Sequence, residues 1–508
     1  MLEKNNRSIN SLLNAISAIS LTLVNGLMGF VVTRLILSYY GSDFNGLNST
    51  ANQVVHVLMI IEGGFITASN VAVFAPYGKN DYQTVNGILS ATRKKFHKIG
   101  LLFFLVGTAV SVGYALLANS SMEREFIATV IMMTMIPPAF NLFAASTYRV
   151  LLQAQQKEYI VSFTTTVTIG LGHLCNIIMI TNGGPMWMVR VNTMTFSLLS
   201  YLIIIAYTRK KNRFIDLKEP PRPELIKGTN DVMAQRITSV IYDSAPMIFL
   251  SVSSSGGTVM ASVYAVYNNV FIILKSLLRS VIDAPRLSFG QMLTQRKRED
   301  VWPAFAQYEF LIFTAIFVLL TTTCALILPF VGLYTADVND ANYYDKGIAI
   351  MMVIVAVLEL MHIPSNHLIN MAGEFRISRN IQIVSCGVLL AGLAVGGSLW
   401  GMYGMLGALI VVDLLLAVLE MGYVHIRFFK KKLLSLLKLV LPLAVAGVAV
   451  CWAEMSLPLP IHSYFAFAVY GVILVVVNGV IGVAVGLLFN RKELLALLKR
   501  AKNLIKRK

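Results

Sequence analysis

Residues 33–81 contain two long apolar runs joined by a short polar turn, and this pattern constrains the fold more than any other feature of the chain. The turn is the segment YYGSD at residues 39–43. Each run is long enough to cross a bilayer, which requires about 20 apolar residues. Each also carries a few polar groups that a passive anchor would not keep. Because the rest of the chain repeats this hairpin, we expect an all-α protein whose membrane-spanning helices line a transport pathway.

The composition is that of a polytopic membrane protein. Hydrophobic residues make up 56% of the chain, charged residues only 13%, and the mean hydropathy is +0.70, far above that of a soluble domain. The longest segment without an apolar run, residues 209–230, is too short to bury a core of its own. The net charge is +17. The basic residues that produce it lie between the apolar runs and at the C-terminus, where membrane orientation and anionic lipids explain them, so nucleic-acid binding is not expected.

Hydropathy predicts about fourteen membrane-spanning helices. Lys and Arg gather in the connections that follow the even-numbered helices, whereas the other connections hold few bases and the loop 335–346 is acidic. Because basic loops stay in the cytoplasm, both termini are predicted to be cytoplasmic. The helices are expected near residues 11–37, 45–76, 97–118, 126–150, 159–181, 185–207, 232–253, 259–284, 304–334, 347–371, 377–399, 403–426, 433–454 and 464–489.

An internal duplication organises these helices. Gly41 at the first outer turn matches Gly256, and LLQAQQKEYIV from Leu151 resembles LINMAGEFRIS from Leu368 at nearly the same separation. Two pseudo-symmetric six-helix lobes are therefore predicted. Each has an even number of spans, so an axis along the membrane normal should relate them, with substrate bound between them near the midplane. The predicted division is a first lobe at 1–208, a cytoplasmic loop at 209–230, a second lobe at 231–427, two further helices at 428–489 and a basic amphipathic tail at 490–508.

The tail from residue 490 has leucines at helical spacing and bases on its remaining faces. This pattern is typical of a helix that lies on an anionic membrane surface. A solvated tail is the alternative, and neither interpretation gives the tail a chemical role.

The clearest polar set lies on the predicted helix 259–284 and just beyond its end. Its members recur at helical spacing and therefore share one face; they are Asn268, Lys275, Arg279, Asp283 and Arg286. A charge at the centre of a membrane helix costs roughly 2.5–3.5 kcal/mol, so such groups face protein or water. We interpret Asn268, Lys275 and Arg279 as the lining of an aqueous cavity that binds substrate. The alternative is a ladder of ion pairs through Asp283, with Lys275 reaching toward the interface.

The preceding predicted helix, 232–253, places Arg236 and Asp243 on one face. Arg236 would either contact a phosphate of the substrate or extend to the interface. Asp243 would either bind a coupling cation or pair with Lys275 or Arg279. We therefore retain Arg236 as a substrate-binding candidate and Asp243 as an ion-coupling candidate.

The first lobe contributes further candidates. Arg34, Arg149 and Arg190 are substrate-binding candidates, and extension to the membrane interface is the alternative for Arg34 and Arg190. Glu62 is the one acid near the middle of the second predicted helix. It is interpreted either as a residue that couples transport to a cation or as a carboxyl kept neutral by burial.

Motifs for other chemistry do not occur in the sequence. The chain has no glycine-rich phosphate loop after a strand and no nucleophile elbow, and its four cysteines are scattered. We interpret the histidines as polar packing residues, because none has a second metal ligand at zinc-site spacing; those considered are His56, His173, His362 and His367. The sequence thus predicts neither an enzyme nor a cofactor nor a metal site.

The first hairpin carries a family resemblance. Its segments LSYYGSDFNGLNSTANQ, EGGFITAS and FAPYGKND resemble the N-terminal signature of bacterial polysaccharide repeat-unit flippases of the Wzx type. That family belongs to the superfamily that also holds multidrug exporters and lipid II flippases. The resemblance implies a MATE-like, V-shaped pair of lobes around a central basic cavity, in the bacterial cytoplasmic membrane.

The substrate that the resemblance implies is an undecaprenyl-diphosphate-linked oligosaccharide, moved from the inner to the outer leaflet by alternating access. A diphosphate favours Arg and Lys at cavity depth, in agreement with the candidates above. A proton or a sodium ion is the expected coupling ion, and membrane lipids, a polymerase and glycosyltransferases of the same pathway are the expected partners.

Two other functions remain open. A cation-coupled multidrug or metabolite exporter of the same fold is the main alternative, and its cationic substrates should select an acidic cavity. A membrane-bound polymerase or glycosyltransferase is disfavoured, because such enzymes need a sizeable loop or domain that bears catalytic acids and every loop here is short.

Overall fold

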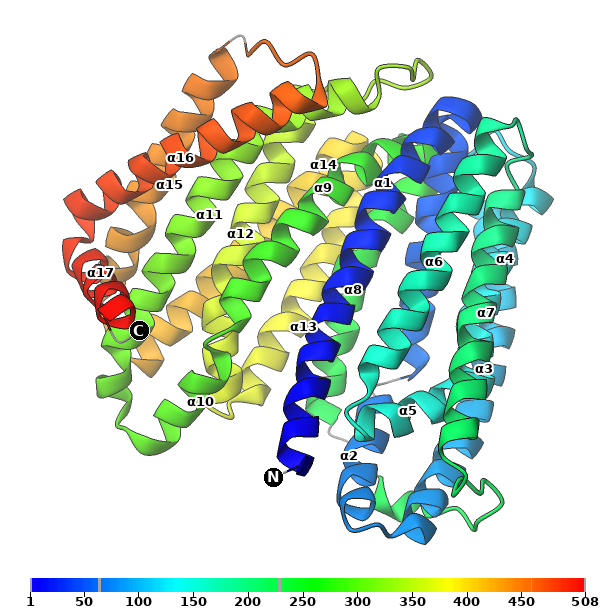
Figure 1. The fold of residues 1–508 in the computed structure, drawn as a ribbon. Coiled ribbons are helices and arrows are strands. Elements are labelled where there is room, and N and C mark those ends of the chain that lie inside the picture. Colours follow the sequence, from blue (N-terminus) through cyan, green and yellow to red (C-terminus); the bar gives the residue numbers. More distant parts are fainter. Residues whose placement is uncertain (1, 63–64, 227–229, 458, 507–508) are drawn as a thin grey trace. The chain divides into compact units, whose positions relative to one another are not determined.

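The computed structural model describes residues 2–506 except 63–64, 227–229 and 458, and the regular elements of this part of the chain are all helical (Figure 1). The predicted all-α fold is therefore confirmed. The helices are α1 (Leu2–Leu58), α2 (Phe65–Gly78), α3 (Tyr82–Leu117), α4 (Arg124–Phe140), α5 (Ser146–Ala154), α6 (Glu158–Thr181), α7 (Met188–Lys211), α8 (Asn230–Val252), α9 (Gly257–Asp283), α10 (Arg286–Gln295), α11 (Arg298–Tyr334), α12 (Lys346–Met371), α13 (Phe375–Gly392), α14 (Ser398–Gly422), α15 (Leu433–Ser456), α16 (Tyr464–Phe489) and α17 (Arg491–Lys506), with short 3₁₀ or π segments η1 (Met59–Glu62), η2 (Asn141–Ala145), η3 (Pro223–Leu225), η4 (Leu393–Gly397) and η5 (Tyr423–Phe428).

Among the described residues, 11 helical segments are long and apolar enough to cross a membrane. Two of them, Leu12–Glu62 with 51 residues and Phe375–Phe428 with 54, are more than twice as long as the ~20 residues of one crossing. Each contains a break, at Gly41 (φ 83°, ψ 174°) and at Gly401 (φ 57°, ψ −130°). With these two segments divided at their breaks and α8 added, the structure has the 14 helices that hydropathy predicts.

Gly41 marks the turn of the first hairpin. In Figure 1, α1 rises from the N-terminus and the chain then returns toward α2 at the lower end. A φ of 83° lies in the region that residues with a Cβ rarely adopt, so glycine is required there. The repeat was expected to place its counterpart at Gly256, but the positive φ (74°) belongs to the next residue, Gly257. The register of the match is thus shifted by one residue, because the turn that precedes α9 ends at Gly257.

The second pair of matched segments forms two similar turns. The chain has a positive φ at Gln156 (58°) and at Gly373 (78°). In both turns, the residue before this position donates its backbone N–H to the carbonyl four residues back, and the residue after it donates to the carbonyl five residues back. The segments that the sequence paired therefore end their helices in the same way.

Residues 1–262 form one compact unit. Within it α6 packs against α1 and α7, and α3 packs against α4, around a core that includes Leu47, Val85, Phe103 and Ile131, all at most 1% exposed. The unit also includes α8, which packs on α1. The lobe boundaries expected from the sequence stay a prediction.

The turn at residues 39–43 is organised around Asp43. Its carboxylate accepts hydrogen bonds from the Ser120 hydroxyl (2.9 and 3.0 Å), from the Ser121 backbone amide (2.9 Å) and from the Thr258 hydroxyl. These donors come from the α3–α4 loop and from the first turn of α9. The acid of the YYGSD turn therefore ties three segments together.

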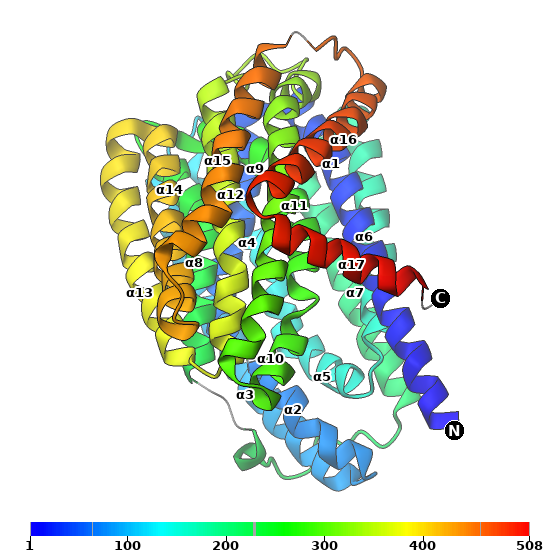
Figure 2. The same cartoon turned by 90° about the vertical axis from the view of Figure 1, so that its left-hand side faces the viewer.

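Residues 263–508 form the second compact unit. Its central helix is α11, which packs against α12, α15 and α16 and buries Phe305, Phe310 and Val331. The tail forms a helix, α17, which begins near the end of α16 (Figure 2), packs against α16 and α11 and buries Leu494 at 7% exposure. The predicted helicity of the tail is confirmed, whereas its place on a membrane surface stays a prediction.

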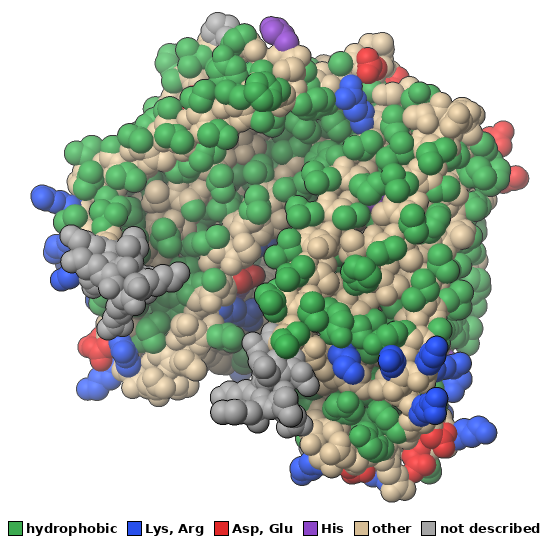
Figure 3. Space-filling model, viewed as in Figure 1, with side chains coloured by type: hydrophobic (Ala, Val, Ile, Leu, Met, Phe, Trp, Pro, Cys, Tyr) green, Lys and Arg blue, Asp and Glu red, His purple; other side chains and the backbone are tan. Residues whose placement is uncertain are grey.

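The surface of the first unit has the distribution expected of a membrane protein. Hydrophobic side chains cover the middle of the face in Figure 3, and Lys and Arg gather at its lower end, around the lower ends of α3, α5 and α7. Apolar side chains on one stripe of α3 are exposed; they include Leu101, Leu105 and Leu116. Such a surface is stable in contact with lipid but not with water.

Candidate functional site

Lys275 and Arg279 meet on one carboxylate, that of Glu359. The Lys275 Nζ lies 2.8 Å from Glu359 Oε2, and the Arg279 Nη2 lies 2.6 Å from Glu359 Oε1. The two bases stand one turn apart on α9, so they share the face that the sequence predicted, and α12 carries the acid. The structure therefore brings both candidates together around a residue that the sequence argument missed.

The three side chains differ in their access to solvent. The Glu359 side chain is 5% exposed, that of Lys275 18% and that of Arg279 47%. Arg279 thus uses one nitrogen on the buried acid and keeps almost half of its surface open to a solute. With both bases and the acid ionised, the trio carries a net charge of +1, so it retains an attraction for anions.

A second acid on α14, Glu420, is fully buried. Its Oε2 lies 2.8 Å from Nδ1 of His362, and its Oε1 accepts a hydrogen bond from the Asn366 amide at 2.7 Å. His362 was interpreted from the sequence as an isolated packing residue, and the structure corrects this by giving it a carboxylate partner on another helix. Since Glu359 and His362 are three residues apart on α12, the polar network runs along one side of that helix.

A third buried acid, Glu309 of α11, continues the network. Its Oε2 lies 2.9 Å from Nε2 of His425, and its Oε1 accepts a hydrogen bond from the Ser365 hydroxyl at 3.4 Å. Together with Asp413, which is also 0% exposed, these acids make the interior of the second unit rich in carboxylates. The sequence did carry a signal for this network, because residues 359, 362, 366 and 370 recur at helical spacing as Glu, His, Asn and Asn.

The first unit has its own group of charged candidates near the end of η1. Glu62 is 9% exposed, and the two charges that act on it most strongly are those of Arg236 and Arg149. Arg236 itself is exposed on α8. The charges of Arg236 and Arg149 therefore act on Glu62, although the three residues are far apart in the chain.

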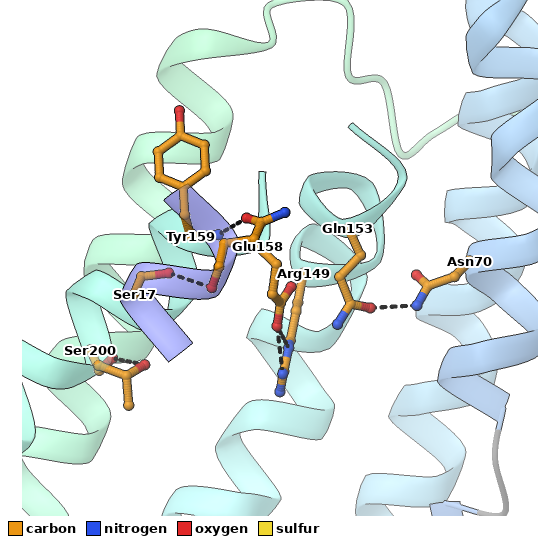
Figure 4. Close-up of polar contacts among 9 residues, drawn as sticks. Ser17, Asn70, Arg149, Gln153, Glu158, Tyr159 and Ser200 are labelled. Carbon is orange, nitrogen blue, oxygen red and sulfur yellow. Dashed lines mark hydrogen bonds and ion pairs between the residues drawn. The ribbon is translucent and has the colours of Figure 1, made fainter. Parts of the chain in front are cut away.

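Arg149 is held in place by an ion pair within the same unit (Figure 4). Its Nη2 and Nε lie 2.7 and 3.1 Å from Oε1 of Glu158, the first residue of α6. The short helix α5 that carries Arg149 follows a π segment after Pro137-Pro138, and its Gln153 accepts a hydrogen bond from Asn70 of α2. The Arg149 side chain is 40% exposed, so it remains partly accessible beside its acid.

Arg190 occupies a different environment. Its residue is 5% exposed, and its guanidinium donates to Asn52 Oδ1 at 3.1 Å and to the backbone carbonyl of Asn48. These bonds fasten α7 to the second half of α1, so the arrangement is that of a packing residue. Its role in substrate binding stays a prediction.

The other candidates are distributed over three helices. Arg34 is half-buried on α1, Asn268 is half-buried on α9 two turns before Lys275, and Asp243 is exposed on α8. Both bases of α9 contact the carboxylate of Glu359. Ion coupling at Asp243 stays a prediction.

Several solved structures of transporters of the MOP superfamily share this architecture. An inward-facing multidrug resistance transporter of the MATE family matches with a TM-score of 0.62 at 13% identity, covering 88% of this chain and 99% of its own. The fold is that of MOP superfamily transporters. The lipid II flippase MurJ, in an inward closed conformation, matches this fold with a TM-score of 0.54 at 12% identity over 94% of this chain and 99% of its own.

A third match within the MOP superfamily bears on charge. A transporter from Pyrococcus furiosus, described as having a binding pocket of reverse polarity, matches with a TM-score of 0.55 at 13% identity over 87% of this chain and 96% of its own. No family model matches the sequence, and no curated protein matches it. At identities this low the likeness establishes the fold and leaves the substrate to the chemistry of the site.

Proposed function

We propose that the protein is a flippase that moves an undecaprenyl-diphosphate-linked oligosaccharide from the inner to the outer leaflet of the bacterial cytoplasmic membrane by alternating access. The observation that carries the proposal is the pair of bases on Glu359. Lys275 lies near the middle of the 39-residue membrane segment Gly257–Gln295, and Arg279 follows one turn later. A diphosphate is the lipid-linked group that two neighbouring cations recognise best.

The geometry supports an exchange of partners at Arg279. In the empty site Glu359 neutralises one of the two positive charges, which keeps the bases in place at a tolerable desolvation cost. A doubly charged diphosphate displaces the carboxylate from Arg279, the more exposed base. The charge of the occupied site is then −1, which favours uptake of a proton by Glu359. Substrate binding and proton uptake are thereby coupled.

A proton is the coupling ion that this scheme favours, and a sodium ion is the alternative. Glu62 is the equivalent candidate in the first unit, because it is a buried acid on which the charges of Arg236 and Arg149 act. Asp243 on α8 remains an ion-coupling candidate from the sequence. A membrane potential supplies about 2.3 kcal/mol per elementary charge per 100 mV, which suffices to drive such a cycle.

A second function has one specific observation in its favour. Buried carboxylates in the second unit outnumber its buried Lys and Arg among the described residues; they are Glu309, Glu359, Asp413, Glu420 and Glu454. An acidic cavity is what the cationic substrates of a cation-coupled multidrug or metabolite exporter should select. Three of these acids are engaged by His or basic partners, which is why we favour the flippase.

The test is reconstitution into proteoliposomes with a labelled undecaprenyl-diphosphate saccharide, scored by access of the head group to an external enzyme. We expect wild type to move the label and a variant with both Lys275→Gln and Arg279→Gln to lose at least about tenfold in rate, since each lost charge-assisted contact contributes about 1.5–3 kcal/mol. Arg298→Gln is the matched control, because Arg298 also pairs with an acid but is 56% exposed. No movement by wild type, or equal loss in control and double variant, would remove the proposal.

A further inference from the structure

Two pairs of a histidine and a glutamate lie in the described part of the second unit, and they differ in their access to solvent. In the pair of His425 and Glu309 the side chains are 1% and 0% exposed, so this pair is closed on both sides. In the pair of His362 and Glu420 the acid is 0% exposed, whereas the imidazole is 12% exposed. Both members of the second pair lie in segments long and apolar enough to cross a membrane. Ionisable side chains at that depth are candidates for proton binding.

The hydrogen bonds around Glu420 determine how its two oxygens are used. Asn366 accepts a hydrogen bond from the Asn370 amide at Oδ1 (3.0 Å) and donates from Nδ2 to Glu420 Oε1 (2.7 Å). The same Nδ2 also donates to Ser378 Oγ at 3.1 Å, so both hydrogens of this amide are used. Oε1 therefore acts as an acceptor and carries no hydrogen. A hydrogen shared by His362 and Glu420 must then lie on the 2.8 Å contact between Nδ1 and Oε2.

This contact sets the chemistry of the other ring nitrogen of His362. With Glu420 ionised, Nδ1 carries the hydrogen and donates it to Oε2, which leaves a lone pair on Nε2 of the neutral ring. Because Glu420 is shut off from solvent, the exposed part of the pair belongs to the imidazole. A proton that reaches the pair therefore enters through the ring, where Nε2 is the basic atom. The carboxylate on the other side of the ring then faces an imidazolium.

The surroundings of His362 act on such a charge in two opposite ways. Burial opposes it, whereas the carboxylates of Glu420, Asp413 and Glu359 attract it. The other charged or titratable groups around α12 have contacts of their own; they are Lys275 and Arg279 on Glu359, Asp283 on His367, Arg286 acting on the same His367, His425 on Glu309, and Arg379 beside Asn380. The partner of an imidazolium at position 362 is therefore Glu420.

We propose that His362 is a proton-binding residue of the second unit, whose Nε2 takes up a proton while Glu420 stays ionised and accepts the hydrogen bond from Nδ1. In the protonated state an ion pair fastens α12 to α14. Release of the proton to water breaks no other bond and leaves a hydrogen bond from a neutral ring, which is weaker. Proton binding thus changes a helix contact one turn away from Glu359. It requires no substrate and is independent of the flippase function.

The test is solid-state ¹⁵N NMR of histidine side chains in the full-length protein, reconstituted without substrate and recorded from about pH 5 to about pH 9. The ring nitrogens distinguish the imidazolium from the two neutral tautomers. The signals of His362 are those that disappear in His362→Gln. We expect them to change from the imidazolium at low pH to the tautomer with hydrogen on Nδ1 at high pH. One neutral form over the whole range, or hydrogen on Nε2 at high pH, would overturn the proposal.

His97 provides the internal reference in these spectra. Its Nε2 lies 2.9 Å from the carbonyl oxygen of Phe143, so its neutral ring should carry the hydrogen on Nε2, opposite to His362. In Glu420→Gln the proton affinity of His362 should fall at least about tenfold, which is one pH unit, while the signals of His97 stay as in wild type. An unchanged titration of His362 in this variant would show that Glu420 does not stabilise the imidazolium. The tautomer of wild type decides the question even where this variant does not fold.

A pH step applied to proteoliposomes on a solid-supported membrane gives a second, electrical readout. Proton entry into a site inside the membrane displaces charge, and wild type should therefore give a transient current without substrate. His362→Gln keeps a donor toward Glu420 but cannot take up the proton, so it should displace less charge than wild type. His97→Gln is the matched control and should displace as much as wild type. Equal displacement by wild type and His362→Gln would show that His362 does not bind the proton.

Discussion

Oε2 of Glu309 and Nε2 of His425 lie 2.9 Å apart, with side chains that are 0% and 1% exposed. The pair joins α11 to η5, the π segment that follows α14, and the ring of Trp302 stands edge-on to the imidazole with centroids 5.1 Å apart. The desolvation cost of so deeply buried a pair offsets much of its attraction, so the pair itself contributes little to the net stability of the fold. Removal of one partner, however, leaves the other buried without an opposite charge.

We expect His425→Ala to destabilise the protein by about 3–5 kcal/mol, because it leaves the Glu309 carboxylate buried and unpaired. His425→Gln should lose much less, since an amide can still donate to the carboxylate. The measurement is thermal unfolding of the purified protein in detergent. Arg298→Ala is the matched control: it breaks an exposed pair with Glu374, whose contribution should be about 0–1 kcal/mol. Equal effects of His425→Ala and the control would contradict the prediction.

Replacing Glu359 should strengthen anion binding. Glu359→Gln removes the carboxylate that competes with a diphosphate for Lys275 and Arg279, so affinity should rise about tenfold or more, which corresponds to about 1.4 kcal/mol. The measurement is titration calorimetry in detergent with a short-chain isoprenyl diphosphate sugar, whose diphosphate is a diester and keeps a charge of −2 over the pH range used. Glu374→Gln serves as the control, because Glu374 pairs with a base at the exposed end of α11. A Glu359→Gln variant that binds as wild type does would show that the acid does not compete.

The same titration has a pH dependence whose sign follows from charge. The occupied site of wild type carries −1 if Glu359 stays ionised, so binding favours its protonation and the affinity for the diphosphate should rise as pH falls. Glu359→Gln removes the titrating group and should flatten this dependence. The comparison covers the range of about pH 5–8, in which an ordinary solvent-exposed glutamate is ionised. A parallel dependence in the two proteins would assign the titration to another group.

Sequence patterns predicted those features that are determined within a single helix or turn. The breaks at Gly41 and Gly401, the shared face of Lys275 and Arg279 and the matched turns all follow from local spacing and backbone preference. Glu359 could not be predicted in this way, because the periodicity of α9 shows which residues share a face and not which acid of another helix lies opposite. The same reason explains why Glu62 and Arg149 were identified as separate candidates although they interact.

The first turn of α3 provides a test of local structure outside the membrane segments. Asp81 caps this helix by accepting a hydrogen bond from the Thr84 backbone amide at 3.0 Å. The bonds from the Thr84 side chain and amide hold the pKa of Asp81 below its usual value. Because the folded-state pKa is lowered, the cap is complete above the unfolded pKa and is lost as pH falls through the folded one.

We expect amide hydrogen exchange in this turn, corrected for intrinsic rates, to accelerate in wild type near about pH 3 relative to about pH 6. Asp81→Asn should retain the cap at both values, since asparagine caps helices as well as aspartate and does not titrate. Asp81→Ala should show fast exchange at both. If the exchange rate of wild type relative to the two variants were the same at both pH values, the carboxylate would have no role in the cap.

The close approach of α1 and α9 at Gly46 predicts a large effect of a single methyl group. A Cβ at Gly46 would lie 1.7 Å from the Thr258 carbonyl oxygen, and neighbouring Asn45 donates to Ser262 at 2.7 Å. Gly46→Ala must therefore separate the two helices, at a cost of about 1–3 kcal/mol or more. Gly29→Ala is the matched control on the same helix, because a Cβ there meets nothing within 4 Å, and it should stabilise by about 0.5–1 kcal/mol through helix propensity. Thermal unfolding of both variants in detergent measures the difference, and a Gly46→Ala protein as stable as Gly29→Ala would show that the helices do not meet there.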